Sequence, residues 1–390
     1  MKTLHVGIIG AGFTGQQHVE AIRRIPGTDV VALSDSNAEI AKIKCEQLAI
    51  KDCYSDYKEM LSQPDIDIIH NCTPNNMHYP INKDIIRSKK HVFCEKPLAI
   101  STQETGELLS LAMQTGVAHG VNFNYRQNSM IQEMRQRVYS GDTGRIFMLH
   151  GHYLQDWLLY DSDYDWRMDP VIGGPSRAVA DIGSHWFDLA QFVTGKKIQS
   201  VYANLMIIHP VRKHRSLKNE TFSANGGELN KELMNEVKIA SEDAAFIIMR
   251  LEDGTPGILV ISQVSAGRKN DISINIDSSE YSMEWQQEKP DVLFTGHRNK
   301  PNQVFCSSPQ NLTGDAKRYA TLPGGHPVAW HDALRNGINE FYQSIRNNTY
   351  SSGTQNYATF KDGHRIVALT EACVESSKTN QWVTVCSNKF

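Results

Sequence analysis

Residues 4–15 read Leu-His-Val-Gly-Ile-Ile-Gly-Ala-Gly-Phe-Thr-Gly, and this stretch decides the fold of the first part of the chain. Its apolar, β-branched start predicts a buried strand over 4–9. Gly10, Gly12 and Gly15 then complete the pattern G-x-G-x-x-G, and the apolar spacing of the following residues predicts a helix. A strand, a glycine turn and a helix in this order can hold the pyrophosphate of a dinucleotide.

Each position of the turn has a physical reason. Gly10 allows a tight turn, Gly12 lets the backbone approach the phosphates, and Gly15 lets the helix pack closely on the strand. Phe13 and Thr14 lie at the expected start of the helix, where backbone N–H groups and the positive end of the helix dipole favour an anion. We therefore expect these residues to bind the cofactor.

The second strand indicates NAD as the cofactor. It is expected over 29–34 and ends at Asp35, 20 residues after Gly15, where an acidic side chain binds the ribose hydroxyls. This carboxylate would accept hydrogen bonds from the ribose and repel a 2′-phosphate. The next residues, Ser36 and Asn37, also lack the arginine that an NADP enzyme would often supply.

The bulk properties describe a soluble globular protein without a nucleic-acid or membrane partner. The chain has 390 residues, which suggests two or three domains, and it is 40% hydrophobic and 21% charged with a net charge of −3. No apolar stretch approaches the roughly 20 residues that span a bilayer, and the expected first strand leaves no room for a signal peptide. Seven scattered cysteines without a C-x-x-C pair indicate reduced cytoplasmic thiols and no metal site.

The pattern of the chain changes after the first third, and we expect two domains, over 1–125 and 126–390. The first alternates apolar runs with helical stretches, which predicts an α/β domain with a parallel sheet. The expected strands cover 4–9, 29–34, 66–72, 91–94 and 117–123, and the expected helices cover 13–25, 37–48, 77–89 and 102–115.

The second domain is expected to be α+β, with a mainly antiparallel sheet and one helix over 184–193 that Gly195 closes. Two helical patterns follow within 331–379, and their helices could pack back on the first domain. Residues 212–238 are polar with an early basic cluster, so we expect a solvated insertion loop. The expected strands cover 145–156, 198–208, 243–252, 257–265 and 271–285.

Polar residues follow three later strands of the first domain, at the carboxyl ends where a parallel sheet binds its ligands. A charged pair directly after a buried strand is unusual, and Glu95 and Lys96 fall where the nicotinamide should lie. The residues concerned are Thr73, Asn75 and His78 after the third expected strand, Glu95 and Lys96 after the fourth, and Asn124 and Tyr125 after the fifth.

Asp181 and His185 stand four residues apart at the expected start of a helix, so they share one face. An imidazole that moves a proton needs an orienting partner, and a carboxylate can serve. A helix cap beside a packed histidine is the more common explanation for a lone pair of this kind. The presence of Lys96 elsewhere in the chain favours the catalytic interpretation.

These patterns together resemble the glucose–fructose oxidoreductase / inositol dehydrogenase / rhizopine-catabolism (Gfo/Idh/MocA) family over essentially the whole chain. The resemblance implies a Rossmann domain and a C-terminal domain with a large open sheet, which commonly forms the subunit interface. By position, Lys96 matches the family's catalytic lysine, and Asp181 and His185 match its Asp/His pair. In relatives the bond between Lys96 and Pro97 is often cis. The matched cofactor-side positions are Gly10, Gly12, Gly15, Asp35, Thr73, Asn75, His78 and Glu95, with Lys96 beside them.

The resemblance implies oxidation of a secondary alcohol, which needs a hydride acceptor and a base for the hydroxyl proton. We expect His185, oriented by Asp181, to be the base and Lys96 to hold the substrate hydroxyl. The reverse assignment stays open, because burial and a cationic nicotinamide would favour neutral lysine.

Two further stretches are candidates for the substrate pocket. Rings, a cation and carboxylates around Trp166, Arg167 and Asp169 suit a polyhydroxylated ring. The stretch around His326 resembles a segment of relatives that act on pyranoses and anhydrosugars. A packing role is the alternative for both stretches.

We therefore expect a cytoplasmic, NAD-dependent oxidoreductase that acts on a pyranose, an anhydrosugar or a cyclitol such as inositol. The alternatives are an NADP-dependent sugar-ketone reductase, a hydrolase that recycles bound NAD, and a nucleotide-binding regulator without turnover. Apolar positions on the open face of the second sheet would be exposed in a monomer, so we expect a homodimer or homotetramer through that sheet.

Overall fold

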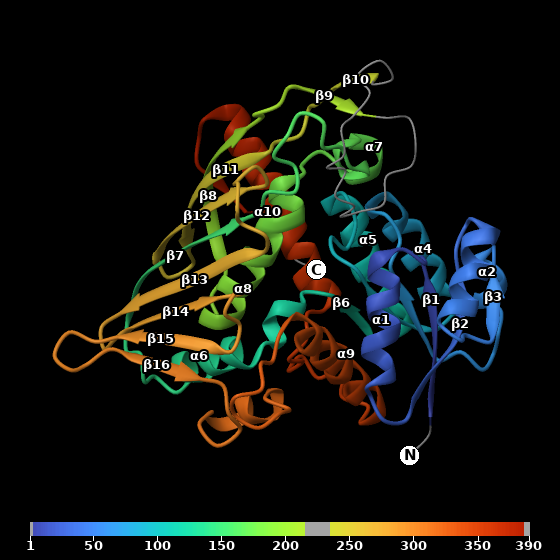
Figure 1. Cartoon of the computed structure of the whole chain (residues 1–390), viewed down its shortest axis with the longest axis horizontal. Helices are drawn as coiled ribbons and strands as arrows, with labels where there is room; N and C mark the ends of the chain where they lie inside the picture. The colour runs from blue at the N-terminus through green and yellow to red at the C-terminus, as the bar shows by residue number, and fades with distance from the viewer. Residues whose placement is uncertain (1–2, 215–234, 386–390) are drawn as a thin grey trace. The chain divides into compact units, whose positions relative to one another are not determined.

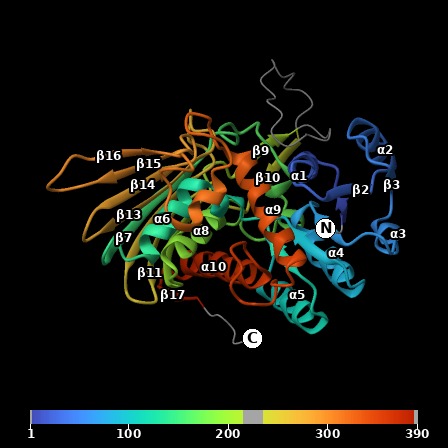
Figure 2. The same ribbon diagram turned by 90° about the horizontal axis from the view of Figure 1, so that it is seen from below.

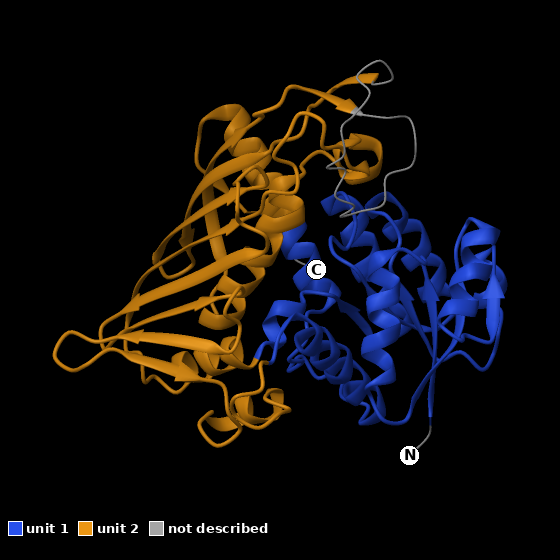
Figure 3. Cartoon of the chain, viewed as in Figure 1, with its two compact units in different colours: residues 1–128, 328–367, 388–390 blue, residues 129–327, 368–387 orange. Residues whose placement is uncertain are grey.

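The computed structural model describes residues 3–214 and 235–385, which form two compact units (Figure 3). Helix α10, Phe360–Thr379, contributes residues to both of them. Within the described ranges, no helix is both long and apolar enough to cross a membrane. The first unit comprises residues 1–128, 328–367 and 388–390, and the second comprises residues 129–327 and 368–387.

The first unit is built on six parallel strands in the order β3-β2-β1-β4-β5-β6, of which Figure 1 labels β1, β2, β3 and β6. This order confirms the predicted Rossmann sheet, in which dinucleotides bind where the strand order reverses, beside β1 and β4. The strands are β1 (Leu4–Ile9), β2 (Thr28–Ser34), β3 (Asp52–Tyr54), β4 (Ile68–Asn71), β5 (His91–Cys94) and β6 (His119–Val121).

Helices flank this sheet, and a late helix joins the same core. Leu334, Ile338 and Phe341 of α9 belong to the buried apolar cluster that includes Val6 of β1 and Ile22 of α1. The helices are α1 (Phe13–Arg23), α2 (Ala38–Gln47), α3 (Tyr57–Leu61), α4 (Asn75–Arg87), α5 (Thr102–Thr115), α9 (Trp330–Arg346) and the first part of α10.

The second unit is built on nine strands in the order β16-β15-β14-β13-β7-β12-β11-β8-β17. Only β7 and β12 pair in parallel among these described neighbours, so the sheet is mainly antiparallel, as predicted. The strands are β7 (Ile146–Leu154), β8 (Ile198–Met206), β11 (Ala244–Leu251), β12 (Pro256–Ser262), β13 (Asp271–Ser278), β14 (Ser282–Gln286), β15 (Val292–Gly296), β16 (Gln303–Cys306) and β17 (Val383–Thr384).

Helices α6 (Ser129–Tyr139) and α8 (Ser184–Thr194) cover one face of this sheet in both views (Figures 1 and 2). Trp186 of α8 is fully buried, and its Nε1 donates a hydrogen bond to the Ser273 carbonyl at 2.8 Å. A Cβ on Gly151 of β7 would stand 2.5 Å from that nitrogen, so only glycine leaves room for the indole. The contact fixes the beginning of α8 against the sheet.

The other face of the nine-stranded sheet carries exposed apolar side chains. Strand β11 alternates, so Ile247 is fully buried while Phe246 and Ile248 are 49% and 44% exposed. Ile258 of β12 and Phe147 of β7 are 41% and 51% exposed. The period of two therefore sends one apolar set into the core and leaves a second set facing outward.

The polar stretch that we expected to be a solvated loop begins with a buried cation. Strands β9 (Val211–His214) and β10 (Asn235–Lys238) pair in an antiparallel ribbon. Arg212 of β9 is fully buried, and its guanidinium contacts the Asp243 carboxylate at 2.6 Å. The expectation is therefore wrong at Arg212, because charge composition cannot show that the fold places a buried ion-pair partner beside this residue. Residues 213–214 and 235–238 of the predicted loop lie in these two strands, and residues 215–234 lie outside the described residues.

Candidate functional site

The glycine turn of the first unit has the geometry that the pattern predicted. Gly10 has a φ of +99°, a conformation that side chains disfavour, and a Cβ there would stand 2.6 Å from the Cys72 carbonyl oxygen. A Cβ on Gly15 would stand 2.0 Å from the Gly10 carbonyl oxygen, whereas one on Gly12 would meet nothing within 4 Å. Gly10 and Gly15 thus serve the protein's own packing, while Gly12 leaves the space beside the turn open.

The open side of the turn offers backbone donors. Gly12 caps α1, and Phe13, the first residue of the helix, is 49% exposed. Thr14 follows and is half-buried. Because the first N–H groups of a helix have no intrahelical acceptor, this end suits the pyrophosphate of a dinucleotide.

Asp35 connects the turn to the following βα loop. Its Oδ2 accepts a hydrogen bond from the Ala11 N–H and its Oδ1 accepts one from the Asn37 N–H, each at 3.0 Å. The carboxylate therefore lies directly at the glycine turn, and each oxygen retains further acceptor capacity. This placement fits recognition of ribose hydroxyls.

The loop after β4 is tied together by polar contacts. Thr73 Oγ1 donates to Asn71 Oδ1 at 2.6 Å, and Asn75 begins α4. His78 is 1% exposed, and its ring nitrogens face the Pro97 carbonyl at 2.5 Å and the Thr73 carbonyl at 2.8 Å. Burial lowers the pKa of His78. The imidazole therefore bridges the loop after β4 and the loop after β5.

Glu95 and Lys96 follow β5, and the Glu95 carboxylate is held on both oxygens. Its Oε1 accepts from His18 Nε2 at 2.8 Å and from Asn122 Nδ2 at 2.6 Å, and its Oε2 accepts from the Lys96 N–H at 3.3 Å. Burial alone would raise the pKa of Glu95, but His18, Asn122 and the Lys96 charge lower it to about 2. Lys96 itself is half-buried, and the bond between Lys96 and Pro97 is cis.

Asn124 and Tyr125 follow β6 in a short 3₁₀ turn, Asn124–Gln127. Both side chains are 3% exposed. The Asn124 Nδ2 is buried and has no hydrogen-bond partner among the described residues. A buried amide donor of this kind calls for an acceptor, which a ligand could supply.

Asp181 and His185 belong to the second unit, and the backbone between them differs from the expectation. Asp181 lies in a π-helical turn, Val179–Gly183, and not in the α-helix, while His185 is the second residue of α8. The two segments are continuous, because Gly183 and Ser184 both have right-handed helical angles. A π-turn inside a helix is often found at functional sites. His185 is 8% exposed, with its ring centroid 6.3 Å from that of Tyr153.

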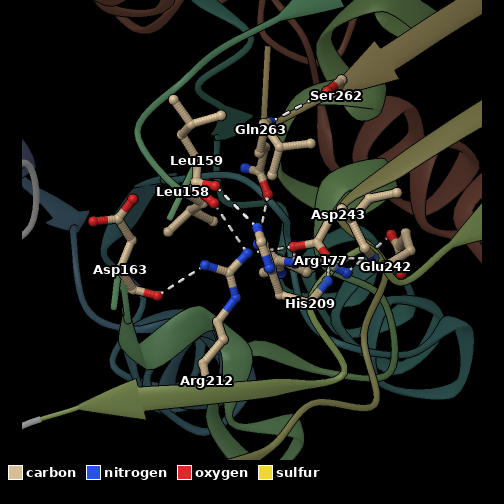
Figure 4. A network of polar contacts seen from close by, with 12 residues as sticks. Leu158, Leu159, Asp163, Arg177, His209, Arg212, Glu242, Asp243, Ser262 and Gln263 are labelled. Atoms are coloured by element: carbon tan, nitrogen blue, oxygen red, sulfur yellow. Dashed lines mark hydrogen bonds and ion pairs between the residues drawn. The ribbon is translucent and has the colours of Figure 1, made fainter. Parts of the chain in front are cut away.

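A buried network that includes Gln263, Arg177, Arg212 and Asp243 (Figure 4) reaches Asp181 through Gln263. Gln263 donates from Nε2 to Asp181 Oδ2 at 3.0 Å, and its Oε1 accepts from Arg177 Nη1 at 3.2 Å. Arg177 also pairs with Asp243, the carboxylate that Arg212 contacts. Burial would raise the pKa of Asp243, but the two guanidiniums, together with the backbone N–H of His209, lower it.

The start of the π-helical turn has its own acceptor. Glu242 Oε1 accepts hydrogen bonds from the Val179 N–H at 2.8 Å, the Arg177 N–H at 3.1 Å and the Ser176 hydroxyl at 2.7 Å. Burial nevertheless raises the pKa of Glu242. This contact fixes the turn that carries Asp181.

The three residues predicted around position 166 have local structural partners. Arg167 lies over the Trp166 ring at 4.4 Å, and its Nε stands 3.5 Å from Asp181 Oδ1. The Asp169 carboxylate caps α7 (Pro170–Gly173) by accepting from the Val171 N–H at 2.9 Å. Arg167 is thus placed beside the candidate acid, whereas the Asp169 carboxylate caps a helix. His326 is exposed in a turn, where its Nδ1 stands 3.1 Å from the Pro323 carbonyl.

Sequence reasoning missed several residues that hold the candidate groups. His18 contacts Glu95 and Gln263 contacts Asp181, although each pair is far apart in the sequence. The only local signal was the position of His18 on the apolar face of α1, beside Val19.

Two family models match the chain. Residues 4–123 match the family described as "Oxidoreductase family, NAD-binding Rossmann fold", and residues 131–284 match the "GFO/IDH/MocA C-terminal domain". The chain is 28% identical to the levoglucosan dehydrogenase of Pseudarthrobacter phenanthrenivorans over 99% of both chains. It is 26% identical to the myo-inositol 2-dehydrogenase of Thermotoga maritima, over 52% of this chain and 58% of that one.

A solved structure shares the fold over the whole length. Levoglucosan dehydrogenase in complex with NADH and levoglucosan is similar with a TM-score of 0.86 and 24% identity, over 98% of this chain and 100% of that chain.

Proposed function

The chain belongs to the Gfo/Idh/MocA oxidoreductase family, and we propose that it uses NAD to oxidise a secondary hydroxyl of a pyranose, an anhydrosugar or a cyclitol. The observation that carries this proposal is the likeness over 99% of both chains to a levoglucosan dehydrogenase, an enzyme named for an anhydrosugar. A cyclitol remains in the substrate class because half of the chain is similar to a myo-inositol dehydrogenase.

The residues around the glycine turn fit the cofactor. Gly12 leaves space for phosphates beside the turn, and the Asp35 carboxylate lies next to the same turn with acceptor capacity for ribose hydroxyls. When bound, NAD supplies the hydride acceptor. An acidic side chain at position 35 supports NAD over NADP, because it would repel a 2′-phosphate.

We assign the proton chemistry to Lys96 and His185. His185 takes the hydroxyl proton as general base, with Asp181 as its carboxylate partner, and Lys96 holds the substrate oxygen and favours its developing negative charge. The network of Gln263 and Arg177 supports this assignment, because it fixes the Asp181 carboxylate in one orientation. Arg167 and the unpartnered amide of Asn124 are the substrate-side candidates.

We further propose that the protein works in the cytoplasm as a homodimer or homotetramer. The six described cysteines are free thiols, as expected in a reducing compartment. Exposed Phe246, Ile248 and Ile258 make the open sheet face the proposed interface.

A substrate screen tests the proposed activity. Levoglucosan, other pyranoses and inositols are incubated with NAD⁺ or NADP⁺, and the absorbance of reduced nicotinamide is followed. We expect turnover of at least one of these alcohols with NAD⁺. Turnover with NADP⁺ alone would favour the reductase alternative, and cleavage of a glycoside without net reduction would favour cofactor recycling. Tight NAD binding without either reaction would indicate a regulator.

A further inference from the structure

We infer that His18, His70 and Tyr342 form a hydrogen-bonded relay that holds the Glu95 carboxylate in place beside Lys96, which makes these three buried side chains positioning residues for the reaction. Their link to turnover rests on the proposed function, whereas the relay itself is a property of the first unit and can be tested without a substrate.

The relay is continuous and buried. Glu95 Oε1 stands 2.8 Å from His18 Nε2, His18 Nδ1 stands 2.7 Å from His70 Nδ1, and His70 Nε2 stands 2.8 Å from the Tyr342 hydroxyl. The side chains of His18, His70 and Tyr342 are fully buried, and the whole Glu95 residue is 9% exposed. The four residues come from α1, β4, α9 and the loop after β5, so distant parts of the chain converge on one line of contacts.

The donors and acceptors of this line determine the two tautomers. A carboxylate only accepts, so His18 Nε2 must donate to Glu95. With neutral rings, His18 Nδ1 is then an acceptor, and His70 Nδ1 must donate to it. His70 Nε2 in turn accepts from Tyr342. Every donor therefore points toward Glu95, and each of the four groups is satisfied.

The opposite direction of these hydrogen bonds needs one more proton, on His18. If His18 Nδ1 donated to His70, His18 would have to be an imidazolium in order to keep its bond to Glu95. Burial and the neighbouring His18 lower the pKa of His70 well below its usual range, and burial raises the pKa of Tyr342. Neutral His70 and protonated Tyr342 are compatible with both directions, so the tautomer of His70 is the observation that distinguishes them.

The relay acts on the residue that precedes the proposed catalytic lysine. Glu95 Oε1 is occupied by His18 and Asn122, and its Oε2 accepts from the Lys96 backbone. A buried carboxylate without these donors would take up a proton, because burial disfavours its charge. The titratable groups that influence or are influenced by Glu95 are His18, His78, Lys96, Cys72 and Cys94.

Imidazole nitrogen NMR tests the relay directly on the full-length protein. With ¹⁵N-labelled histidine, we expect His18 to show the Nε2–H tautomer and His70 the Nδ1–H tautomer at neutral pH. The signals are assigned by their loss in His18→Gln and His70→Gln. Opposite tautomers, or the averaged signals of exposed histidines, would overturn the relay whether or not any sugar is oxidised.

Two substitutions of His18 test the effect on Glu95 through an NMR titration of ¹³C-carboxyl-labelled glutamate, because the acid limb of kcat/KM reports the proposed base, His185. In wild type the pKa of Glu95 is lowered to about 2, so its charge is lost only in strong acid. His18→Leu removes the hydrogen bond from His18 that lowers this pKa and leaves burial, so the titration midpoint of Glu95 should rise by at least about one pH unit. His18→Gln retains an N–H donor and should restore most of the wild-type profile.

A pair of tyrosine variants separates the relay from general packing. Tyr342→Phe removes the first donor of the relay. Tyr357→Phe removes another buried hydroxyl of the same apolar cluster, one that contacts Ser344 Oγ at 3.0 Å outside the relay. We expect only Tyr342→Phe to change the His70 Nε2 signal and to lower kcat severalfold with little change in KM for NAD⁺. Equal effects of the two variants, or an unmoved Glu95 titration midpoint in His18→Leu, would refute the positioning role.

Discussion

The carboxylate of Asp35 accepts a hydrogen bond from the backbone N–H of Ala11 at 3.0 Å, so the candidate ribose-binding acid is attached to the glycine turn itself. Asp35→Ser replaces the carboxylate with a shorter, uncharged hydroxyl. We expect it to weaken NAD⁺ binding and to improve the relative use of NADP⁺ by at least about tenfold, because the repulsion of a 2′-phosphate is lost. Kinetics with both cofactors measure the change.

Asp35→Asn is the matched control, since it keeps an oxygen for Ala11 and removes only the charge. If charge sets the preference, both variants shift toward NADP⁺, and only Asp35→Ser loosens the turn. Wild-type protein that uses NADP⁺ as well as NAD⁺ would contradict the assignment.

Gly12 and Gly15, which lie on either side of Phe13 and Thr14, should respond differently to alanine. A Cβ on Gly15 would stand 2.0 Å from the Gly10 carbonyl oxygen, so Gly15→Ala must move backbone and should destabilise the fold by about 1–3 kcal/mol or more. A Cβ on Gly12 meets nothing within 4 Å, so Gly12→Ala should keep the Tm and weaken NAD⁺ binding. Thermal unfolding and cofactor titration distinguish the two. A normal affinity for NAD⁺ in Gly12→Ala would place the phosphates elsewhere.

Local patterns predicted the parts of this fold that depend on neighbouring residues. The glycine turn, the strand before it and the helix after it are specified within residues 4–25, and Gly195 closes α8 with a φ of +70°. The strand and helix within 52–61 were missed, because three and five residues are too few to show a period.

The supports of the candidate site could not be predicted in the same way. His18 and His70 meet only after β4 is inserted next to β1, and Gln263 reaches Asp181 only when β12 ends beside the π-helical turn. Arg212 was misjudged for the same reason, since its partner Asp243 stands 31 residues away. Tertiary contacts determine which partners such polar side chains have. A single sequence gives no local indication of those contacts.

The proposed roles of Lys96 and His185 predict large losses of turnover. Lys96→Ala and His185→Ala should each lower kcat by about two or more orders of magnitude, which is the usual loss for a positioned acid or base. Binding of NAD⁺ by the first unit should largely survive, and an exposed lysine variant, Lys58→Ala, should leave both quantities unchanged. Either site variant that keeps most of its turnover would lose its assigned role.

Gln263 should matter because it bridges Arg177 and the Asp181 carboxylate. Gln263→Met has a similar volume but leaves both partners without that bond, at a cost of about 1–3 kcal/mol for a buried group. We expect a lower Tm and a severalfold lower kcat, because Asp181 loses one of the contacts that orient its carboxylate.

Gln191→Met provides the control for this effect. Gln191 is a buried glutamine of α8 whose Oε1 accepts from the Ile198 N–H at 3.1 Å. It should lower stability to a comparable degree while kcat stays near wild type. A similar fall of kcat in both variants would mean that Gln263 acts through stability alone.

We expect the open face of the nine-stranded sheet to form the interface between subunits. Phe246 and Ile248 stand on one side of β11 with 49% and 44% of their surfaces exposed, and apolar surface of this kind is stabilised by burial against a second copy. We expect a dimer or tetramer mass for the wild type by light scattering at micromolar concentration.

Phe246→Lys places a charge on that face and should shift the mass toward the monomer. Met113→Lys changes a residue of α5 that is 65% exposed, and it should leave the mass unchanged. A wild-type monomer would contradict the proposed assembly, and an oligomer that survives Phe246→Lys would place the interface on another surface.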